Sequence, residues 1–235
     1  ILHADRVIVS EIPGTTRDSI DIPFEIGSGP QARRYVLTDT AGIRAKRKVD
    51  TAVEKFSLIR AEDSIANADV CVLLLDGAQG PTAQDKKIAA LIFEYRKGCI
   101  IAVNKWDLLA DVSTPQEYET ALRRELPFLD FVSVIFISAL SGYNIRQVLD
   151  TVNIVAKNMA VKLPTGPLNR VLEEAYARVP PPMVHGRRLK IYYAVQTGTC
   201  PQRVALFVNE PPLFPANYGT YLAAAVRRRF DLSGT

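Results

Sequence analysis

From residue 34 onward, short apolar runs rich in β-branched residues alternate with stretches of helical periodicity, and this alternation limits the possible folds more than any other feature. The runs expected to be strands are 34–39, 70–76, 98–104 and 133–138. Strands that alternate with amphipathic helices form βαβ units, in which parallel strands build one sheet with helices on both faces. The first part of the chain is therefore predicted to be an α/β domain.

The sequence between the predicted strands contains two patterns that are typical of helix N-termini. Thr82 and Asp85 have the spacing of a capping box ahead of a helical pattern. Thr114, Pro115 and Glu117 supply a cap, a first-turn proline and a third-position carboxylate. A helix is predicted to begin at each of these positions.

The chain changes character after a long amphipathic helix predicted over 144–159. The segment AVKLPTGP, at 160–167, breaks the helical pattern with proline and glycine, so we place a domain boundary there and divide the chain into 1–162 and 163–235. The second part is predicted to hold a helix near 167–178, strands at 189–197 and 203–209, and a helix near 216–230. This order is typical of a small α+β module.

The 235 residues suffice for one large domain or two modest ones. The chain is 48% hydrophobic and 23% charged, like an ordinary soluble protein, and no apolar run approaches the roughly 18 residues that span a bilayer. We therefore expect no membrane segment, and the start ILHADRVIVS lacks the shape of a signal peptide. The three widely spaced cysteines favour a reducing cytoplasm and no metal cluster.

The charge is unevenly spread along the chain. Residues 1–162 hold 20 Lys and Arg against 21 Asp and Glu, whereas residues 163–235 hold 9 against 4. A positive excess in the second part favours a polyanionic partner, although the asymmetry is mild and is weak evidence by itself.

The first candidate site lies where the run 34–39 ends, in Asp39-Thr40-Ala41-Gly42. Ligands of open parallel sheets bind beyond the carboxyl ends of the strands. A carboxylate there can hold the water shell of Mg²⁺, and a glycine lets a backbone N–H approach a phosphate. A strand followed by a tight turn explains the same four letters.

The second candidate is Asn104-Lys105-Trp106-Asp107, which closes the run 98–104. A carboxylate that accepts from two neighbouring N–H donors recognises guanine and rejects adenine, which lacks that pair. Asn104 would contact the base from the other side, and the methylene stem of Lys105 would cover its face. As a lone tetrapeptide, this string also suits a surface turn.

Two further segments have little specificity alone. Ser138-Ala139-Leu140 ends the run 133–138 in residues whose backbone N–H groups can meet a base oxygen. Thr15 and Thr16, in the string IPGTTRD at 12–18, offer hydroxyls suited to Mg²⁺, or merely a capped turn. The order and spacing of all four segments together make chance a poor explanation.

These segments resemble the Der (EngA) family of bacterial ribosome-assembly GTPases. The strings that carry the resemblance are IPGTTRD (12–18), DTAGIRAKRKVD (39–50), VNKWDLL (103–109) and ISA (137–139). The likeness covers nearly the whole chain and implies the second of two tandem G domains followed by a KH-like domain. The implied fold is a P-loop NTPase-type G domain and a small α+β KH-like domain.

The resemblance also implies roles for single residues. Thr16 would be the switch I threonine that ligates Mg²⁺, with Thr15 a less favoured ligand, and Asp39 and Gly42 would sense Mg²⁺ and the γ-phosphate. The implied catalytic residues are Thr16, Asp39 and Gly42, with Thr16 and Asp39 on the metal. The implied guanine pocket comprises Asn104, Lys105, Asp107, Ser138 and Ala139, with Leu140 beside it.

Two departures from the family pattern concern chemistry. The chain contains no G-x-x-x-x-G-K-[ST] string, which the pattern places just before Ile1, and the first strand of the sheet is missing with it. Either that segment is absent from this chain, which we favour, or the polypeptide does not hold nucleotide tightly. Ile43 follows Gly42 where many GTPases have glutamine, so hydrolysis would be slow and would depend on a partner or a monovalent cation. The resemblance points to potassium-stimulated relatives.

The resemblance implies GTP and GDP as ligands and a cytoplasmic role in assembling the large ribosomal subunit. Ribosomal RNA and a preceding G domain would be partners. The basic stretch 44–48 would lie on switch II and grip phosphates in one nucleotide state, unless it is simply a solvated loop. Residues 163–235 contain no GXXG string, so docking of this module against another G domain is as plausible as RNA contact. A scaffold with a vestigial G domain and an Era-like single-G-domain GTPase remain alternatives.

Overall fold

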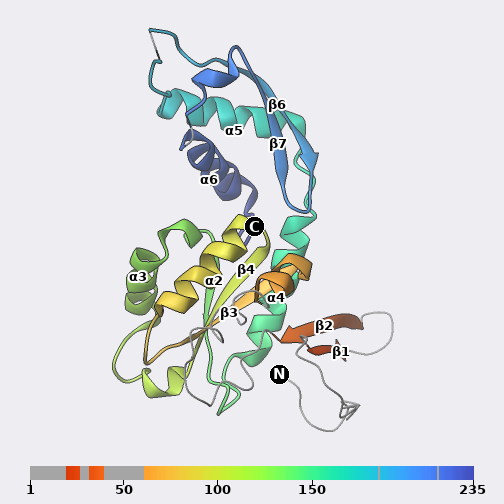
Figure 1. Cartoon of the computed structure of the whole chain (residues 1–235), viewed down its shortest axis with the longest axis vertical. Coiled ribbons are helices and arrows are strands. Elements are labelled where there is room, and N and C mark those ends of the chain that lie inside the picture. Colours follow the sequence, from red (N-terminus) through yellow and green to blue (C-terminus); the bar gives the residue numbers. More distant parts are fainter. Residues whose placement is uncertain (1–19, 27–31, 40–60, 185, 216) are drawn as a thin grey trace.

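The computed structural model describes residues 20–26, 32–39, 61–184, 186–215 and 217–235. Figure 1 shows two modules joined end to end by a narrow waist, and the C-terminus lies at that waist. The lower module in this view holds the parallel sheet, and the upper module holds the last two strands and two helices.

A parallel three-stranded sheet forms the centre of the lower module. Its strands are β3 (Val70–Asp76), β4 (Gly98–Asn104) and β5 (Ser133–Phe136), in the order β3-β4-β5. The first six residues of β4 are buried, because helices cover both faces of this middle strand. The predicted α/β architecture is confirmed, with β3 and β4 at the expected residues.

Two apolar cores lie on the two faces of this sheet. On one face, Leu73, Leu75, Ile101 and Val103 pack with α2 (Ala83–Glu94), α3 (Pro115–Glu125) and the 3₁₀ turn η3 (Pro127–Leu129). On the other face, Ile100, Ala102 and Ile135 pack with Val148 and Val155 of α4 (Ile145–Met159). Alternate residues of β4 therefore serve different cores, as expected for a strand buried on both faces.

Both predicted helix starts are present, and each carries a capping box. The Thr82 side chain accepts from the backbone N–H of Asp85, whose carboxylate accepts from the Thr82 N–H at 2.8 Å. Thr114 and Glu117 repeat this exchange at the start of α3, where the Thr114 N–H lies 2.9 Å from the Glu117 carboxylate. Local hydrogen bonding therefore fixes where both helices begin.

The strand predicted at 34–39 does not join the parallel sheet. It is β2 (Arg33–Asp39), which pairs antiparallel with β1 (Ile20–Ile26) in a separate two-stranded sheet. The expectation of one parallel sheet was wrong for this strand, because among the described residues β2 pairs with β1 and not with the strands of the parallel sheet. The Tyr35 hydroxyl donates to Asn153 Oδ1 at 2.9 Å and fastens the hairpin to α4. Strand β1 and the helical segment 61–67 were not predicted.

The upper module is an antiparallel strand pair packed against two helices. Its elements are α5 (Thr165–Arg178), β6 (Ile191–Gly198), β7 (Arg203–Val208), the 3₁₀ turn η4 (Pro211–Leu213) and α6 (Tyr218–Phe230). Asn169 on α5 binds the backbone of Ala194 in β6 twice, accepting from its N–H at 2.7 Å and donating to its oxygen at 2.9 Å. This amide pairing locks α5 onto the strands, and the predicted small α+β module is confirmed.

The end of the chain links the two modules at the waist. The Gly234 N–H donates to the Phe131 oxygen at 2.9 Å, and the Gly234 oxygen accepts from the Cys99 N–H at 2.8 Å. Arg227 of α6 lies over the Phe131 ring, with its guanidinium carbon 4.0 Å from the ring centroid, and its Nε donates to the Thr235 oxygen. The upper module thus contacts the amino ends of β4 and β5, opposite the end that carries Asn104.

In the part of the chain described here, no helix has both the length and the apolar composition needed to cross a membrane.

Candidate functional site

The carboxyl ends of the three parallel strands meet at one edge of the sheet. Asp76 and Asn104 are paired neighbours at the ends of β3 and β4. The line of β5 continues beyond Phe136, because Ile137 donates to the Val103 oxygen at 2.8 Å and its own oxygen accepts from the Trp106 N–H at 3.0 Å. These backbone bonds bring the segments after β4 and β5 side by side.

Asn104 and Ala139, predicted to share a pocket, are in direct contact. The Ala139 N–H donates to Asn104 Oδ1 at 2.9 Å. We expected N–H groups of this segment to face a base oxygen, and here that of Ala139 serves Asn104. Ser138 is buried, with its hydroxyl oxygen accepting from the Ser141 N–H at 3.2 Å, whereas Leu140 is 91% exposed. Ser138 therefore stabilises the loop 138–141 from its buried side, and Leu140 is the solvent-exposed residue of that loop.

Trp106 anchors the loop that carries Lys105 and Asp107. Its ring is 5% exposed, packs edge-on against Tyr118 with centroids 5.6 Å apart and lies 4.3 Å from the Phe136 ring. The chain turns sharply at Lys105, which has φ +63°, and enters the 3₁₀ turn η2 (Trp106–Leu108). Because Trp106 is held inside, its neighbours Lys105 and Asp107 stand exposed beside Asn104.

Asp76 belongs to this edge and was not assigned a role from the sequence. Its Oδ2 accepts from Lys105 Nζ at 2.6 Å, and its Oδ1 accepts from the Ala78 N–H at 3.0 Å. The hydrogen bond from Lys105, helped by that from Ala78, lowers the pKa of the Asp76 carboxyl below its usual value. The available signal was that the apolar run VCVLLLD ends in a carboxylate, as the run before Asp39 does.

Gly77 completes the contact between the two strand ends. Its N–H donates to the Asn104 oxygen at 2.8 Å, and its oxygen accepts from the Tyr118 hydroxyl at 3.0 Å. A hollow of about 310 Å³ lies next to this contact, and its lining residues are Gly80, Pro81, Tyr118, Ala121, Leu122, Arg124 and Glu125. None of the predicted base-contacting residues lines this hollow, so it is not the predicted base site.

The predicted phosphate and metal residues lie largely outside the described residues. Thr15, Thr16 and Gly42 fall there, as does the side chain of Asp39, although the Asp39 backbone ends β2 as predicted. The structure therefore describes the residues predicted to contact the base and joins Asn104 to Ala139 among them, while the base-contacting and phosphate-contacting roles both stay predictions.

Two family models match the chain. Residues 1–105 match a family described as a 50S ribosome-binding GTPase. Residues 162–235 match the KH-domain-like C-terminal region of EngA bacterial GTPase enzymes. The two matches fall on the two modules of Figure 1.

Curated relatives match over the whole chain. A protein named GTPase Der from Caldanaerobacter subterraneus subsp. tengcongensis is 46% identical over 235 residues, which are 100% of this chain and 53% of that protein. GTPase Der from Thermoanaerobacter sp. strain X514 is 44% identical over the same shares. The chain thus spans about half the length of the curated relatives it matches.

A solved structure of Aquifex aeolicus Era bound to GDP and AlF₄⁻ aligns with 95% of this chain and 78% of that chain, at 21% identity and a TM-score of 0.46.

Proposed function

Because the chain belongs to the Der (EngA) family of GTPases, we propose that its first module reads guanine within a switch that hydrolyses GTP to GDP and phosphate. The observation that carries this proposal is the bond between Asn104 and Ala139 beside the anchored Lys105–Asp107 loop. Matches to Der proteins over the full chain give the Era-like alternative less support.

The base-reading chemistry follows from the exposed groups at this edge. The Asp107 carboxylate would accept from two guanine N–H donors, and adenine would leave it unpaired, which is costly for a desolvated charge. Asn104, held by Ala139, would present its amide nitrogen, and the Lys105 stem would cover the face of the base. Ser138 would keep the Ala139 loop in place from its buried position.

The phosphate chemistry rests on residues whose side chains the structure does not describe. The hydroxyl of Thr16, with Thr15 as the weaker candidate, and the carboxylate of Asp39 are oxygen donors of the kind that Mg²⁺ accepts. Bound there, the ion would neutralise phosphate charge, and Gly42 would contact the γ-phosphate. Ile43 cannot orient water as glutamine does, so we expect slow hydrolysis stimulated by K⁺ or by a partner.

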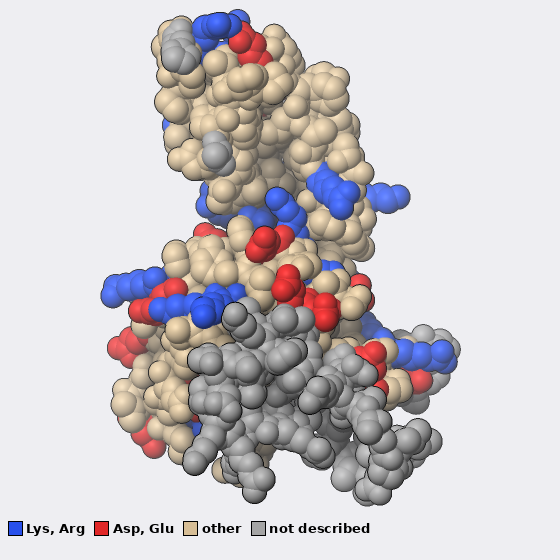
Figure 2. Space-filling model, in the orientation of Figure 1, with Lys and Arg blue, Asp and Glu red and all other residues tan. Residues whose placement is uncertain are grey.

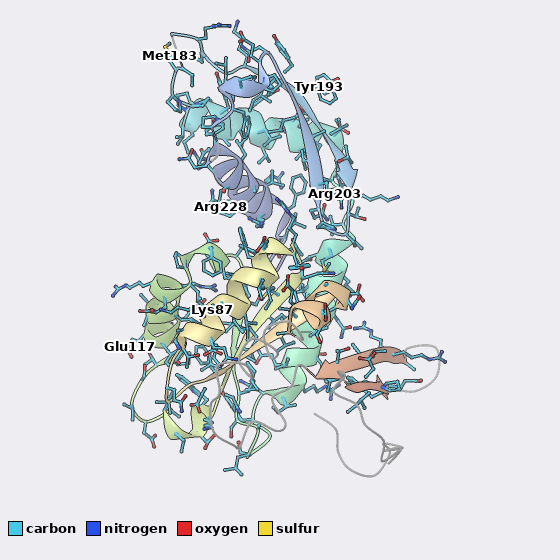
Figure 3. All side chains as sticks on the ribbon, in the orientation of Figure 1. Lys87, Glu117, Met183, Tyr193, Arg203 and Arg228 are labelled. Atoms are coloured by element: carbon cyan, nitrogen blue, oxygen red, sulfur yellow. The ribbon has the colours of Figure 1, made fainter. Side chains whose placement is uncertain are left out.

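We place the G domain at 1–162 and the KH-like domain at 163–235, acting in the bacterial cytoplasm on the large ribosomal subunit. Family descriptions naming a 50S ribosome-binding GTPase and a KH-like region support this role. Figure 2 shows Lys and Arg side chains gathered near the waist and at the far end of the upper module, and Arg228, labelled in Figure 3, is part of the waist group. Such groups suit ribosomal RNA phosphates. A preceding G domain would be the second partner.

Nucleotide competition in the full-length protein tests the proposal. GTP and GDP should displace a fluorescent guanine nucleotide at least about a hundredfold more effectively than ATP and ADP, since adenine leaves polar groups of the site unpaired. Equal displacement by ATP would overturn it. Loss of nucleotide binding altogether would favour the alternative of a non-catalytic scaffold.

A further inference from the structure

We infer that Asp76 is a positioning residue of the base site, which holds the ammonium of Lys105 so that the methylene stem of Lys105 is presented to the base. This inference rests on the proposed guanine-reading function and adds a residue to it. The juxtaposition that carries it is the 2.6 Å contact between Lys105 Nζ and Asp76 Oδ2, across the paired ends of β3 and β4.

The two oxygens of the Asp76 carboxylate accept hydrogen bonds from different partners. Oδ1 accepts from the backbone N–H groups of Ala78 at 3.0 Å and Gln79 at 3.4 Å, which shape the turn after β3. Oδ2 accepts from Lys105. Since the turn bonds fix the orientation of the carboxylate, the ammonium binds to a group that is itself held in place. Preorganised partners of this kind restrict a long side chain without strain.

The strand ends that carry the pair are also held together. The Gly77 N–H donates to the Asn104 oxygen at 2.8 Å, so the first residue after β3 is bonded to the last residue of β4. The Tyr118 hydroxyl donates to the Gly77 oxygen at 3.0 Å, and the ring of Tyr118 packs on Trp106, the residue next to Lys105. Asp76 therefore keeps a fixed position relative to the backbone of Lys105.

Exposure shows which part of Lys105 remains available. The Lys105 side chain is 52% exposed even though its ammonium is paired, whereas the Asp76 side chain is 24% exposed. The stem can therefore still contact a flat ligand at this edge. A free lysine stem samples many rotamers, and fixing one before the ligand arrives reduces the entropy lost on binding.

A double-mutant cycle on GDP binding to the full-length protein tests this role. Asp76→Asn keeps a carbonyl oxygen that can accept from the turn, but it replaces the oxygen that binds Lys105 with an NH2 group, which cannot accept a hydrogen bond. We expect it to weaken GDP binding about fivefold, the order of one half-exposed charge-assisted hydrogen bond. In a Lys105→Met background, Asp76→Asn should weaken binding less than about twofold, because the group it positions is gone.

Two controls accompany the cycle. Glu125→Gln removes the ion pair between Glu125 and Lys86, whose side chains are 52% and 42% exposed, and it should leave GDP affinity unchanged because neither residue belongs to the predicted base site. Ligand-free Asp76→Asn should unfold at a somewhat lower temperature than the parent, because a carboxyl with a lowered folded-state pKa stabilises the fold. Its circular dichroism spectrum at the assay temperature should match that of the parent, which excludes unfolding as the cause of weaker binding. Loss of the native spectrum at the assay temperature would attribute the weaker binding to misfolding and overturn the inference.

The outcomes separate this inference from the proposed function. Equal losses from Asp76→Asn in both backgrounds would show that Asp76 does not act through Lys105. Unchanged GDP binding in Asp76→Asn, with weakened binding in Lys105→Met, would overturn the inference and leave the proposed function standing. Unchanged GDP binding in Lys105→Ala, which removes the stem itself, would instead defeat the assignment of Lys105 to the base site.

Discussion

At the scale of single residues, the sheet edge that carries Asn104 depends on Gly77, a position with no room for a side chain. A β-carbon placed on Gly77 would lie 2.8 Å from the Asn104 oxygen and 2.9 Å from Leu109 Cδ1. Real β-carbons do not approach a backbone oxygen this closely, so a side chain at 77 must push β3 and β4 apart at their carboxyl ends. The hydrogen bond from Gly77 to Asn104 would be stretched with them.

Gly77→Ala should therefore lower the free energy of unfolding by about 2 kcal/mol, as overpacking of a tight site does. Gly166 is a matched control, because a β-carbon there meets nothing within 4 Å. Gly166→Ala should leave stability unchanged or raise it slightly, since it restricts the unfolded chain. Urea unfolding of the two variants measures the contrast. Equal stabilities would show that the close approach at Gly77 carries no cost.

At the scale of elements, the helix starts and the buried strands could be predicted because the sequence patterns that define them are local. Strands β3 and β4 are continuous apolar runs, and the caps Thr82 and Thr114 bond within three residues of themselves. Strand β1 carries the alternating apolar pattern of a strand at residues 20, 22, 24 and 26 and lies only six residues before β2, but Pro23 within the run argued against a strand there. Asp76 was missed for a different reason, because its ion pair with Lys105 forms only once β3 and β4 align.

Local capping also predicts how α3 responds to substitution. Thr114→Ala should cost about 1 kcal/mol of stability at neutral pH, the usual value of an N-cap. The control Thr120→Ala removes a hydroxyl in mid-helix that donates to the Gln116 oxygen, and it should change stability by less than about 0.5 kcal/mol. Urea unfolding checks both. Similar losses for the two variants would contradict the capping account.

Acid should weaken the same cap. Hydrogen bonds from the N–H and hydroxyl of Thr114 lower the pKa of the Glu117 carboxyl. A carboxyl whose pKa is lowered in the folded state stabilises the protein at pH values above its unfolded-state pKa, and that contribution is lost as the pH falls through the lower folded-state pKa. The cost of Thr114→Ala should therefore be smaller at pH 3 than at pH 7. A cost independent of pH would show that Glu117 does not take part.

At the scale of the whole molecule, the two modules are joined by more than the linker between α4 and α5. Gln202 Nε2 lies within 3.1 Å of the Asn158, Met159 and Val161 oxygens, so the upper module caps the end of α4. Gly234 inserts between Cys99 and Phe131 with φ +76°, and a β-carbon there would lie 2.5 Å from Val155. The upper module is thus connected to the strand that ends at the base site.

Gly234→Ala should displace the end of the chain from the sheet, because the space and the backbone conformation both exclude a side chain. Hydrogen exchange of the Cys99 amide, which donates to the Gly234 oxygen, should accelerate at least about tenfold. Exchange of the Ile101 amide, inside β4, serves as the control and should change little. Unaltered protection at Cys99 would show that this contact does not hold the modules together.

Substitution of Asp107 by asparagine, with guanine and xanthine nucleotides compared as ligands, tests the central claim most directly. Asp107→Asn presents a donor where guanine also presents one, whereas xanthine presents a carbonyl oxygen, so the variant should lose GDP affinity and gain XDP affinity by at least about tenfold each. Asp111→Asn, at an exposed site beyond η2, is the matched control and should keep the parent preference. Competition binding of GDP and XDP to both full-length variants gives the answer. Retained guanine preference in Asp107→Asn would show that Asp107 does not read the base.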